Sequence, residues 1–219
     1  MEQLLKRRRQ LLALAAGTLC GGASFAAFAQ NLFRTPAQSL GPFYPETPLE
    51  KDADLVTVSG QTGIAKGEIT HLSGRVLDRN GRPIKDVLVE VWQCNAYGRY
   101  HHPRDSSDRP LDPNFQGYGS TTTGESGSYA FRTIRPVPYP GRTPHIHFRL
   151  VGRGFQPFVT QMYIAGHPQN ERDGLLRSVG DAKARSALLA NFLPIKAPSG
   201  TMEYTAQFDI VLGVTPQQG

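Results

Sequence analysis

Several features are scarce or missing in this sequence of 219 residues, and each absence excludes a class of protein. There are only two cysteines, which excludes a disulfide-rich scaffold, and no G-x-G-x-x-G or Walker pattern points to a nucleotide cofactor. Beyond the first thirty residues, no stretch approaches the ~20 apolar residues of a membrane-spanning helix, so no membrane span is expected. With 23 Gly and 17 Pro among 39% hydrophobic residues, the chain is neither a coiled coil nor collagen, and it can form a buried core.

The formal net charge of +6 is unevenly distributed along the chain. Residues 1–29 contain Lys6 and Arg7 to Arg9 against the single acidic Glu2, and so supply half of the net charge. The remainder of the chain has no run of Lys or Arg. The sequence therefore argues against a nucleic-acid partner.

Residues 1–29 are predicted to be an export signal peptide. A basic start is followed by an apolar, Gly/Ala-diluted stretch and by an A-x-A cleavage pattern that ends at Ala29. Arg8 and Arg9, followed by Gln-Leu-Leu, resemble a twin-arginine export signal, and an ordinary Sec signal is the alternative. We expect the mature protein to be periplasmic or secreted. Cys94 is then its lone cysteine, and its apolar surroundings predict a buried thiol.

Two regions follow the signal. Residues 30–66 have four prolines and little periodicity, which predicts an extended N-terminal arm laid over another part of the molecule. Residues 67–219 are predicted to be one all-β domain. Short alternating segments separated by Gly/Pro turns predict strands near residues 71–78, 86–93, 129–134, 145–151, 158–164 and 203–214. This pattern is typical of an antiparallel β-sandwich.

Loops and one helix complete the predicted domain. Residues 97–128 form a polar excursion far longer than a hairpin loop, and residues 135–144 form a second loop with four prolines; long loops of this kind are often functional. One short C-terminal helix is predicted over 181–193, capped by Asp181 and with Ala and Leu at helical spacing.

The candidate metal ligands are two histidines and two tyrosines. In a strand, His145 and His147 point to one face and can grasp one metal, while Ile146 points into the sandwich. Tyr139 precedes them on a Pro-rich loop, and Tyr100 follows the second strand. Phenolates and imidazoles together suit ferric iron better than zinc or calcium. For each residue an ordinary surface or core role is the alternative.

A series of motifs, in order, carries a family resemblance. The motifs are Gly74-Arg75-Val76, Val91-Trp92-Gln93-Cys94-Asn95-Ala96, Gly98-Arg99-Tyr100, Asp112-Pro113-Asn114-Phe115, Tyr129-Ala130-Phe131-Arg132-Thr133-Ile134, Pro138-Tyr139-Pro140 and Arg142-Thr143-Pro144-His145-Ile146-His147-Phe148. The series resembles the intradiol ring-cleavage dioxygenases, especially the iron-bearing beta subunit of protocatechuate 3,4-dioxygenase. It covers roughly residues 36–165.

The resemblance implies a β-sandwich with a non-haem Fe(III) held by four residues. Carried over by motif, these metal ligands are Tyr100, Tyr139, His145 and His147, and Tyr139 is the ligand that leaves when substrate binds. Arg142 is implied to lie beside the bound ring and Gln161 near the iron, so with Tyr139 they are the predicted catalytic residues. Trp92 and Tyr44 are implied to border the substrate pocket.

These predictions combine into one predicted function. We expect an exported non-haem Fe(III) dioxygenase that uses O2 to cleave a catecholic ring between its two hydroxylated carbons, giving a muconate-type diacid. Its partners would be a catecholic small molecule and O2, and the resemblance implies a homo-oligomer. The alternative is an exported β-sandwich module that binds carbohydrate or protein without catalysis. The sequence does not identify the ring substituent.

Overall fold

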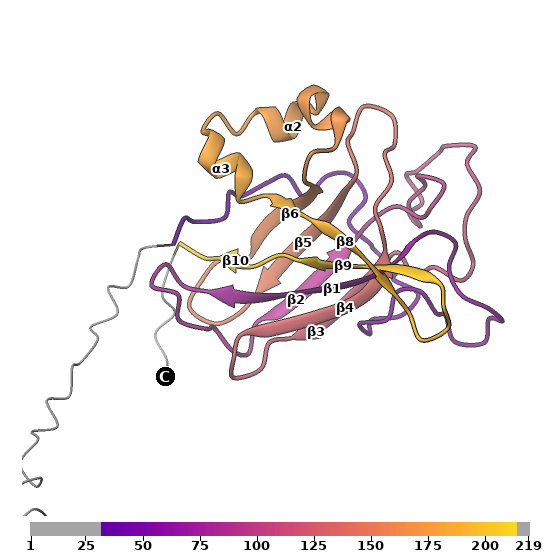
Figure 1. Ribbon diagram of the computed structural model, residues 1–219, viewed down its shortest axis with the longest axis horizontal. Helices are drawn as coiled ribbons and strands as arrows, with labels where there is room; N and C mark the ends of the chain where they lie inside the picture. Colours follow the sequence, from indigo (N-terminus) through magenta and orange to yellow (C-terminus); the bar gives the residue numbers. More distant parts are fainter. Residues whose placement is uncertain (1–31, 214–219) are drawn as a thin grey trace, which may run out of the picture.

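The computed structural model describes residues 32–213 and shows two β-sheets packed face to face (Figure 1). This arrangement confirms the predicted all-β sandwich. The predicted signal peptide lies outside the described residues.

The first sheet is built around β1, which has partners on both edges. On one edge β1 pairs with β4, and on the other it pairs with β9 and then β10, while β8 forms the outer edge beside β9. Its strands are β1 (Ile69–Leu77), β4 (Ser128–Ile134), β8 (Phe192–Lys196), β9 (Met202–Gln207) and β10 (Ile210–Val211).

The second sheet has the order β3-β2-β5-β6-β7, with β5 at its centre. Its strands are β2 (Leu88–Trp92), β3 (Tyr118–Thr122), β5 (His145–Val151), β6 (Phe158–Ile164) and β7 (Leu189–Ala190). Strand β3 lies inside the segment predicted to be one long loop, so that part of the prediction is wrong. Its Gly-Ser-Thr-Thr sequence lacks apolar alternation, and pairing with β2 supplies the order that its own pattern does not indicate.

The sandwich is not antiparallel throughout. Strand β1 runs parallel to β9 and β10, and β6 runs parallel to β7, while the other pairs are antiparallel. Parallel neighbours need a long crossover connection. Between β6 and β7 that crossover is the segment that contains the helices.

The predicted single helix over 181–193 is wrong in length and in number. Helix α3 spans only Ala182–Ser186, although Asp181 caps it as expected by accepting a hydrogen bond from Ala184 N. The chain then leaves the helix because Leu189–Ala190 pairs with β6. Two further turns precede it, η1 (Pro168–Arg172) and α2 (Gly174–Arg177). All three lie together beside the sandwich (Figure 1).

The hydrophobic core lies between the two sheets. Strand alternation supplies it: Leu72 and Val76 point inward from β1, and Ile146 and Phe148 point inward from β5. Ile146 is fully buried, as predicted from its place between the two histidines. The side chains that alternate with these residues on β5 therefore lie on the outer face of the second sheet.

The segment from Leu32 to Lys66 has no helix and no strand of two or more residues, and its first part crosses that outer face. Gln38 N donates to Val159 O of β6 at 2.9 Å, and on the outer face Gln161 Nε2 donates to Ser39 O at 2.9 Å and the Tyr44 hydroxyl donates to Glu90 Oε1 at 2.8 Å. We refer to residues 32–66 as the arm. Because the arm passes over β5 and β6, the outer-face residues His145, His147 and Gln161 are buried.

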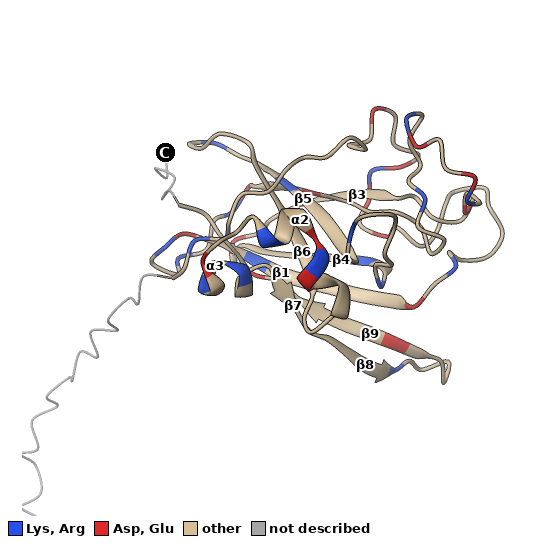
Figure 2. Ribbon diagram, turned by 90° about the horizontal axis from the view of Figure 1, so that it is seen from above, with Lys and Arg blue, Asp and Glu red and all other residues tan. Residues whose placement is uncertain are grey.

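Charges of both signs are interspersed over the ribbon in the described part of the chain (Figure 2). Within residues 32–213, none of the helices has the length and apolar composition needed to cross a bilayer.

Candidate active site

The site forms on the outer face of the second sheet around the two histidines of β5. His145 and His147 alternate with the core residue Ile146, and each is only 2% exposed. Their Nε2 atoms lie 3.2 Å apart, so both rings point to one place. The arm passes directly above: a Cβ at Gly41 would lie 3.3 Å from His147 Cε1. The predicted H-x-H pair is therefore convergent and shielded from water.

The proton positions on His145 follow from its hydrogen bond. Its Nδ1 lies 2.7 Å from Thr143 O, and a carbonyl oxygen can only accept, so Nδ1 carries the proton and Nε2 keeps its lone pair. Burial, reinforced by the nearby Arg142 charge, lowers the pKa of His145 to about 3, so the ring is neutral at pH 7. Burial also lowers the pKa of His147 well below its usual value. Neutral imidazoles are the form that binds metals.

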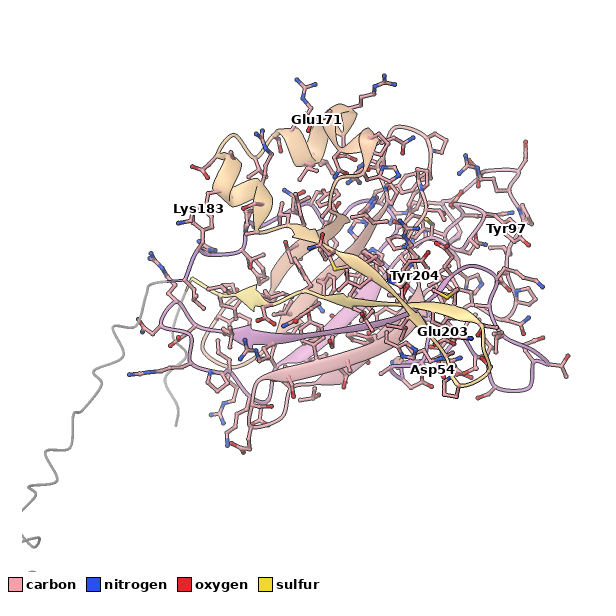
Figure 3. All side chains as sticks on the ribbon, viewed as in Figure 1. Asp54, Tyr97, Glu171, Lys183, Glu203 and Tyr204 are labelled. Atoms are coloured by element: carbon pink, nitrogen blue, oxygen red, sulfur yellow. The ribbon has the colours of Figure 1, made fainter. Side chains whose placement is uncertain are left out.

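Tyr100 reaches the same place from the loop that follows β2. A tight reversal over Asn95 to Arg99 turns the chain back, and Tyr100 N donates to Asp105 Oδ2 at 2.7 Å. The Tyr100 hydroxyl lies 3.5 Å from His145 Nε2, and the side chain is buried. Tyr97, by contrast, is 43% exposed and lies at the outer edge of the molecule (Figure 3). Of these two tyrosines, only Tyr100 is placed to share a site with the histidines.

Tyr139 and Arg142 are the two ends of one turn. Arg142 N donates to Tyr139 O at 3.0 Å, and Pro140 and Gly141, with φ of 80°, occupy the positions that a type II turn requires. The Tyr139 ring lies 5.5 Å, centroid to centroid, from both the Tyr100 and His145 rings. The Pro-rich loop therefore folds over the face of the histidines, as predicted.

The two tyrosines differ in the environment of their hydroxyls. Burial raises the pKa of Tyr100 well above its usual value. Burial also raises the pKa of Tyr139, but the charge of Arg142 and a hydrogen bond with Tyr100 oppose that effect. Neither phenol ionises readily in such surroundings, and a bound cation would reverse this preference by direct attraction.

The donor atoms fit a metal ion only if tyrosine oxygens take part. Within residues 32–213, no cluster of three or more His, Cys, Asp or Glu side chains is arranged to hold a metal. His147 Nε2 lies 3.2 Å from His145 Nε2, and the Tyr100 hydroxyl oxygen lies 3.5 Å from the same His145 atom. The Tyr139 ring lies beside these three atoms. This set of two nitrogens and two phenol oxygens suits ferric iron.

Gln161 lies across from His147 in the ladder between β5 and β6. Its Oε1 accepts hydrogen bonds from Arg142 Nη2 at 2.6 Å and from the Tyr163 hydroxyl at 3.0 Å, while its Nε2 donates to Ser39 O at 2.9 Å. Gln161 therefore joins Arg142 to the arm.

Trp92 contacts both His147 and Tyr44. The Trp92 ring is fully buried and stacks on His147 with centroids 4.7 Å apart and planes 9° apart. Tyr44 packs edge-on against Trp92 at 5.1 Å between centroids, and its hydroxyl donates to Glu90 Oε1 at 2.8 Å. It is Phe43 that contacts Tyr100, at 4.8 Å. A pocket-lining role for Trp92 and Tyr44 stays a prediction.

A cavity of about 380 Å³ opens beside Tyr139. Its lining residues come from the long excursion after β2, the Pro-rich loop and the helical segment: Arg109, Pro138, Tyr139, Pro140, Gly141, Arg142, Thr143, Gln169, Arg172 and Asp173. Asp173 is its single carboxylate and pairs with Arg142 at 2.8 Å. Arg109 and Arg172 therefore leave the cavity with an excess of positive charge.

Sequence reasoning missed Asp173 and Tyr163, both of which hold Arg142. The Asp173-Gly-Leu-Leu sequence has the form of a helix start, a signal that could have marked Asp173 as a cap. No local signal indicates that its carboxylate also reaches a loop some thirty residues earlier.

Comparison with known proteins places this chain in a family. A family model described as Dioxygenase matches residues 40–214. The chain is 42% identical over 185 residues to the protocatechuate 3,4-dioxygenase beta chain of Burkholderia cepacia, covering 80% of this chain and 74% of that protein. It is 28% identical to the catechol 1,2-dioxygenase of Candida albicans, covering 81% of this chain but only 62% of that longer relative.

A solved structure has the same fold. The dioxygenase domain of a dioxygenase and carbohydrate-binding fusion protein from Streptomyces sp. SirexAA-E superposes with a TM-score of 0.64 and 32% identity, covering 84% of this chain and all of that domain. Sequence and fold agree, and the family is generally dependent on non-haem iron(III). The chain therefore belongs to the intradiol ring-cleavage dioxygenases, a family of oxidoreductases.

Proposed function

We propose that this protein binds Fe(III) through Tyr100, Tyr139, His145 and His147, and uses O2 to cleave a catecholic ring between its two hydroxylated carbons. The observation that carries the proposal is the convergence of the two Nε2 atoms, 3.2 Å apart, with the Tyr100 hydroxyl 3.5 Å from one of them. Bound ferric iron would supply the Lewis acidity and electron acceptance that make a catecholate reactive toward O2. The product would be a muconate-type diacid.

Tyr139 is proposed to accept a proton from the substrate. It lies on an exposed Pro-Gly turn rather than in a strand, so its ring can move without disturbing the sheet. A phenolate freed in this way can take a hydroxyl proton from the catechol at its oxygen. Tyr100 stays in place because its ring is buried against Phe43.

Arg142 is proposed to stabilise negative charge on the substrate. Asp173, Gln161 and Tyr163 fix its guanidinium, and the group borders the cavity beside Tyr139. A fixed cation of this kind stabilises charge that develops on the ring without needing to reorganise.

The cavity supports a preference for an acidic catechol. Arg109 and Arg172 lie on its wall without a second carboxylate to balance them. A ring that carries a carboxylate, as protocatechuate does, would be attracted to this side of the site. We propose protocatechuate-type substrates ahead of unsubstituted catechol.

Export and assembly are part of the same proposal. We propose that a twin-arginine signal ending near Ala29 directs the protein to the periplasm or the medium, and that the mature chain forms a homo-oligomer. One relative is named as a beta chain, so a partner subunit is an alternative outcome of a sizing experiment. N-terminal sequencing of the exported protein tests the cleavage position.

The deciding experiment measures iron, colour and oxygen uptake together. Purified protein should contain one iron per chain, absorb visible light through tyrosinate-to-iron charge transfer, and consume O2 with protocatechuate, catechol or hydroxyquinol. Products should be identified, because intradiol and extradiol cleavage give different acids. Tyr100→Phe should shift the absorption band, whereas the exposed control Tyr97→Phe should not. A colourless protein that stays inactive after ferric loading would favour a binding module.

A further inference from the structure

Asp173 is a fully enclosed carboxylate whose two oxygens have different tasks. It lies 31 residues after Arg142 in the chain and is 1% exposed. Its Oδ1 accepts hydrogen bonds from Leu175 N and Leu176 N, each at 3.0 Å, and so caps α2. Its Oδ2 points the other way, toward Arg142 and Thr143.

The Oδ2 atom fixes the direction of the Arg142 guanidinium. Arg142 Nε donates to it at 2.8 Å, while Arg142 Nη2 donates to Gln161 Oε1 at 2.6 Å and to the Tyr163 hydroxyl at 3.3 Å. Because the guanidinium is planar, holding Nε and Nη2 sets the direction of the whole group. The group is thereby kept at the wall of the cavity beside Tyr139.

The same oxygen also holds the backbone that orients His145. Thr143 N donates to Asp173 Oδ2 at 3.0 Å, and Thr143 O accepts from His145 Nδ1 at 2.7 Å. The Thr143 hydroxyl is held as well, since it donates to Asn170 Oδ1 at 2.8 Å. The Thr143 segment is thus fixed by the helical segment on one side and supports the imidazole on the other.

We propose that Asp173 is a positioning residue of the active site, because its buried carboxylate sets both the Arg142 guanidinium and the carbonyl that orients His145. This inference rests on the proposed function, which gives Arg142 and His145 their chemistry. In Asp173→Asn, an amide NH2 in place of Oδ2 would leave the Arg142 Nε–H and the Thr143 N–H without an acceptor. Outer partners of metal ligands typically contribute 10–100-fold to metal affinity or activity, and we expect an effect of about that size.

A purely structural role as a helix cap is the competing explanation. Asp181 provides the matched control, because its side chain caps α3 by accepting from Ala184 N at 2.7 Å, and it is exposed. This hydrogen bond stays within the first turn of α3. If Asp173 were only a cap, Asp173→Asn and Asp181→Asn would affect the protein in the same way.

The test begins with amide hydrogen exchange, which needs no catalysis. In the wild type, the Thr143 amide should exchange slowly because it donates to a buried carboxylate. In Asp173→Asn it should exchange at least about tenfold faster, with the Leu176 amide showing whether the cap survives; Asp181→Asn should leave Thr143 unchanged. Fast Thr143 exchange in the wild type would overturn the proposal without any variant, even if Asp173→Asn does not fold.

Kinetics then separate positioning from general loss of structure. In the wild-type background, Asp173→Asn should lower kcat per bound iron by about 10–100-fold. In the Arg142→Lys background, the same substitution should lower kcat by less than about threefold, because the two residues act as a unit. Fully multiplicative losses would overturn the proposal. If the wild type cleaves no catechol, the proposed function fails, and the exchange experiment still decides the positioning role.

Discussion

Both faces of β5 are covered by other parts of the molecule, with Arg149 partly exposed on the outer face, yet they are stabilised by different means. The inner face carries Ile146, Phe148 and Leu150, and the outer face carries His145, His147 and Arg149. The inner face packs against apolar side chains of the other sheet, where shape and volume suffice. The outer face is covered by the arm and by two loops, and its polar atoms need specific partners.

This contrast separates stability from chemistry within a single strand. Burying imidazoles lowers the pKa of both histidines, so the outer face opposes their protonation and gains no hydrophobic stabilisation from them. The inner face supplies that stabilisation instead. Substitutions on the two faces should therefore fail in opposite ways: outer-face variants should stay folded and lose iron, and inner-face variants should lose stability and keep the site.

The largest effect is expected from His147→Ala. Removing one of two convergent nitrogens should weaken iron binding by about 100-fold or more, above the usual cost of losing an outer partner. The sandwich should remain folded, because the inner face of β5 is unchanged. Metal analysis and circular dichroism check this; a variant that keeps full iron and turnover would show that the site does not depend on the histidines.

Ile146→Ala makes the opposite change, one residue away. A fully buried isoleucine truncated to alanine should reduce the free energy of unfolding by about 2 to 5 kcal/mol. The iron content of the folded fraction should stay near the wild-type value. Chemical denaturation with parallel metal analysis measures both, and a selective loss of iron would mean that the two faces are not independent.

The two tyrosines sharpen the comparison within the outer face. Tyr139→Phe should retain more iron than Tyr100→Phe, because Tyr100 is buried against Phe43 while Tyr139 lies on a turn. Tyr139→Phe should instead slow the binding of catechol, since it removes the proton acceptor. Iron content and stopped-flow binding of both variants decide the matter; wild-type binding rates in Tyr139→Phe would leave this residue as a wall of the cavity.

Tyr44→Phe tests how the arm is held. Glu90, buried on β2, accepts hydrogen bonds from the hydroxyls of Tyr44 and Tyr118 and pairs with Arg149. Losing one donor to this carboxylate should cost about 1 to 3 kcal/mol of stability, with little change in iron content. Tyr97→Phe, on the exposed edge, is the control and should show no loss in thermal melts.

The smallest expected effect is on the pH dependence of stability. Burial alone would raise the pKa of Asp173, but hydrogen bonds from the Leu176 and Thr143 amides and from Arg142 lower it overall. A carboxyl with a lowered folded-state pKa stabilises the protein above its unfolded value of about 3.9 and loses that contribution as the pH falls. The stability gap between iron-free wild type and Asp173→Asn should therefore be constant near neutrality and narrow below about pH 4. A gap that widens in acid would contradict this sign.

Much of the outer face could be predicted because it depends on local spacing. Residues two apart in a strand share a face, so His145 and His147 follow from the sequence once β5 is recognised. The places of Tyr100 and Tyr139 came from motif order, since no spacing rule brings two separate loops to one strand.

Long-range partners could not be predicted from one sequence. The 181–193 segment has helical spacing, but its last residues join sheets whose other strands come from elsewhere in the chain. For Asp173, the sequence likewise indicates only a helix cap. Its contacts with Arg142 and Thr143 depend on how the crossover between β6 and β7 packs. In both cases tertiary pairing overrides the local pattern.

The closure of the arm has a consequence for the order of events during synthesis. The arm leaves the ribosome before its partners: Thr160 bonds to Pro36 across 124 residues, and Val211 to Thr35 across 176. At translation rates of 5–20 residues per second, those partners follow the arm by roughly 6 to 35 s. We infer that the histidines cannot be covered until β6 is made, because Gln161 on β6 bonds to Ser39 of the arm across 122 residues. In a growing chain the two imidazoles are therefore open to solvent until that point, and the start of the arm is fastened only when Val211 follows.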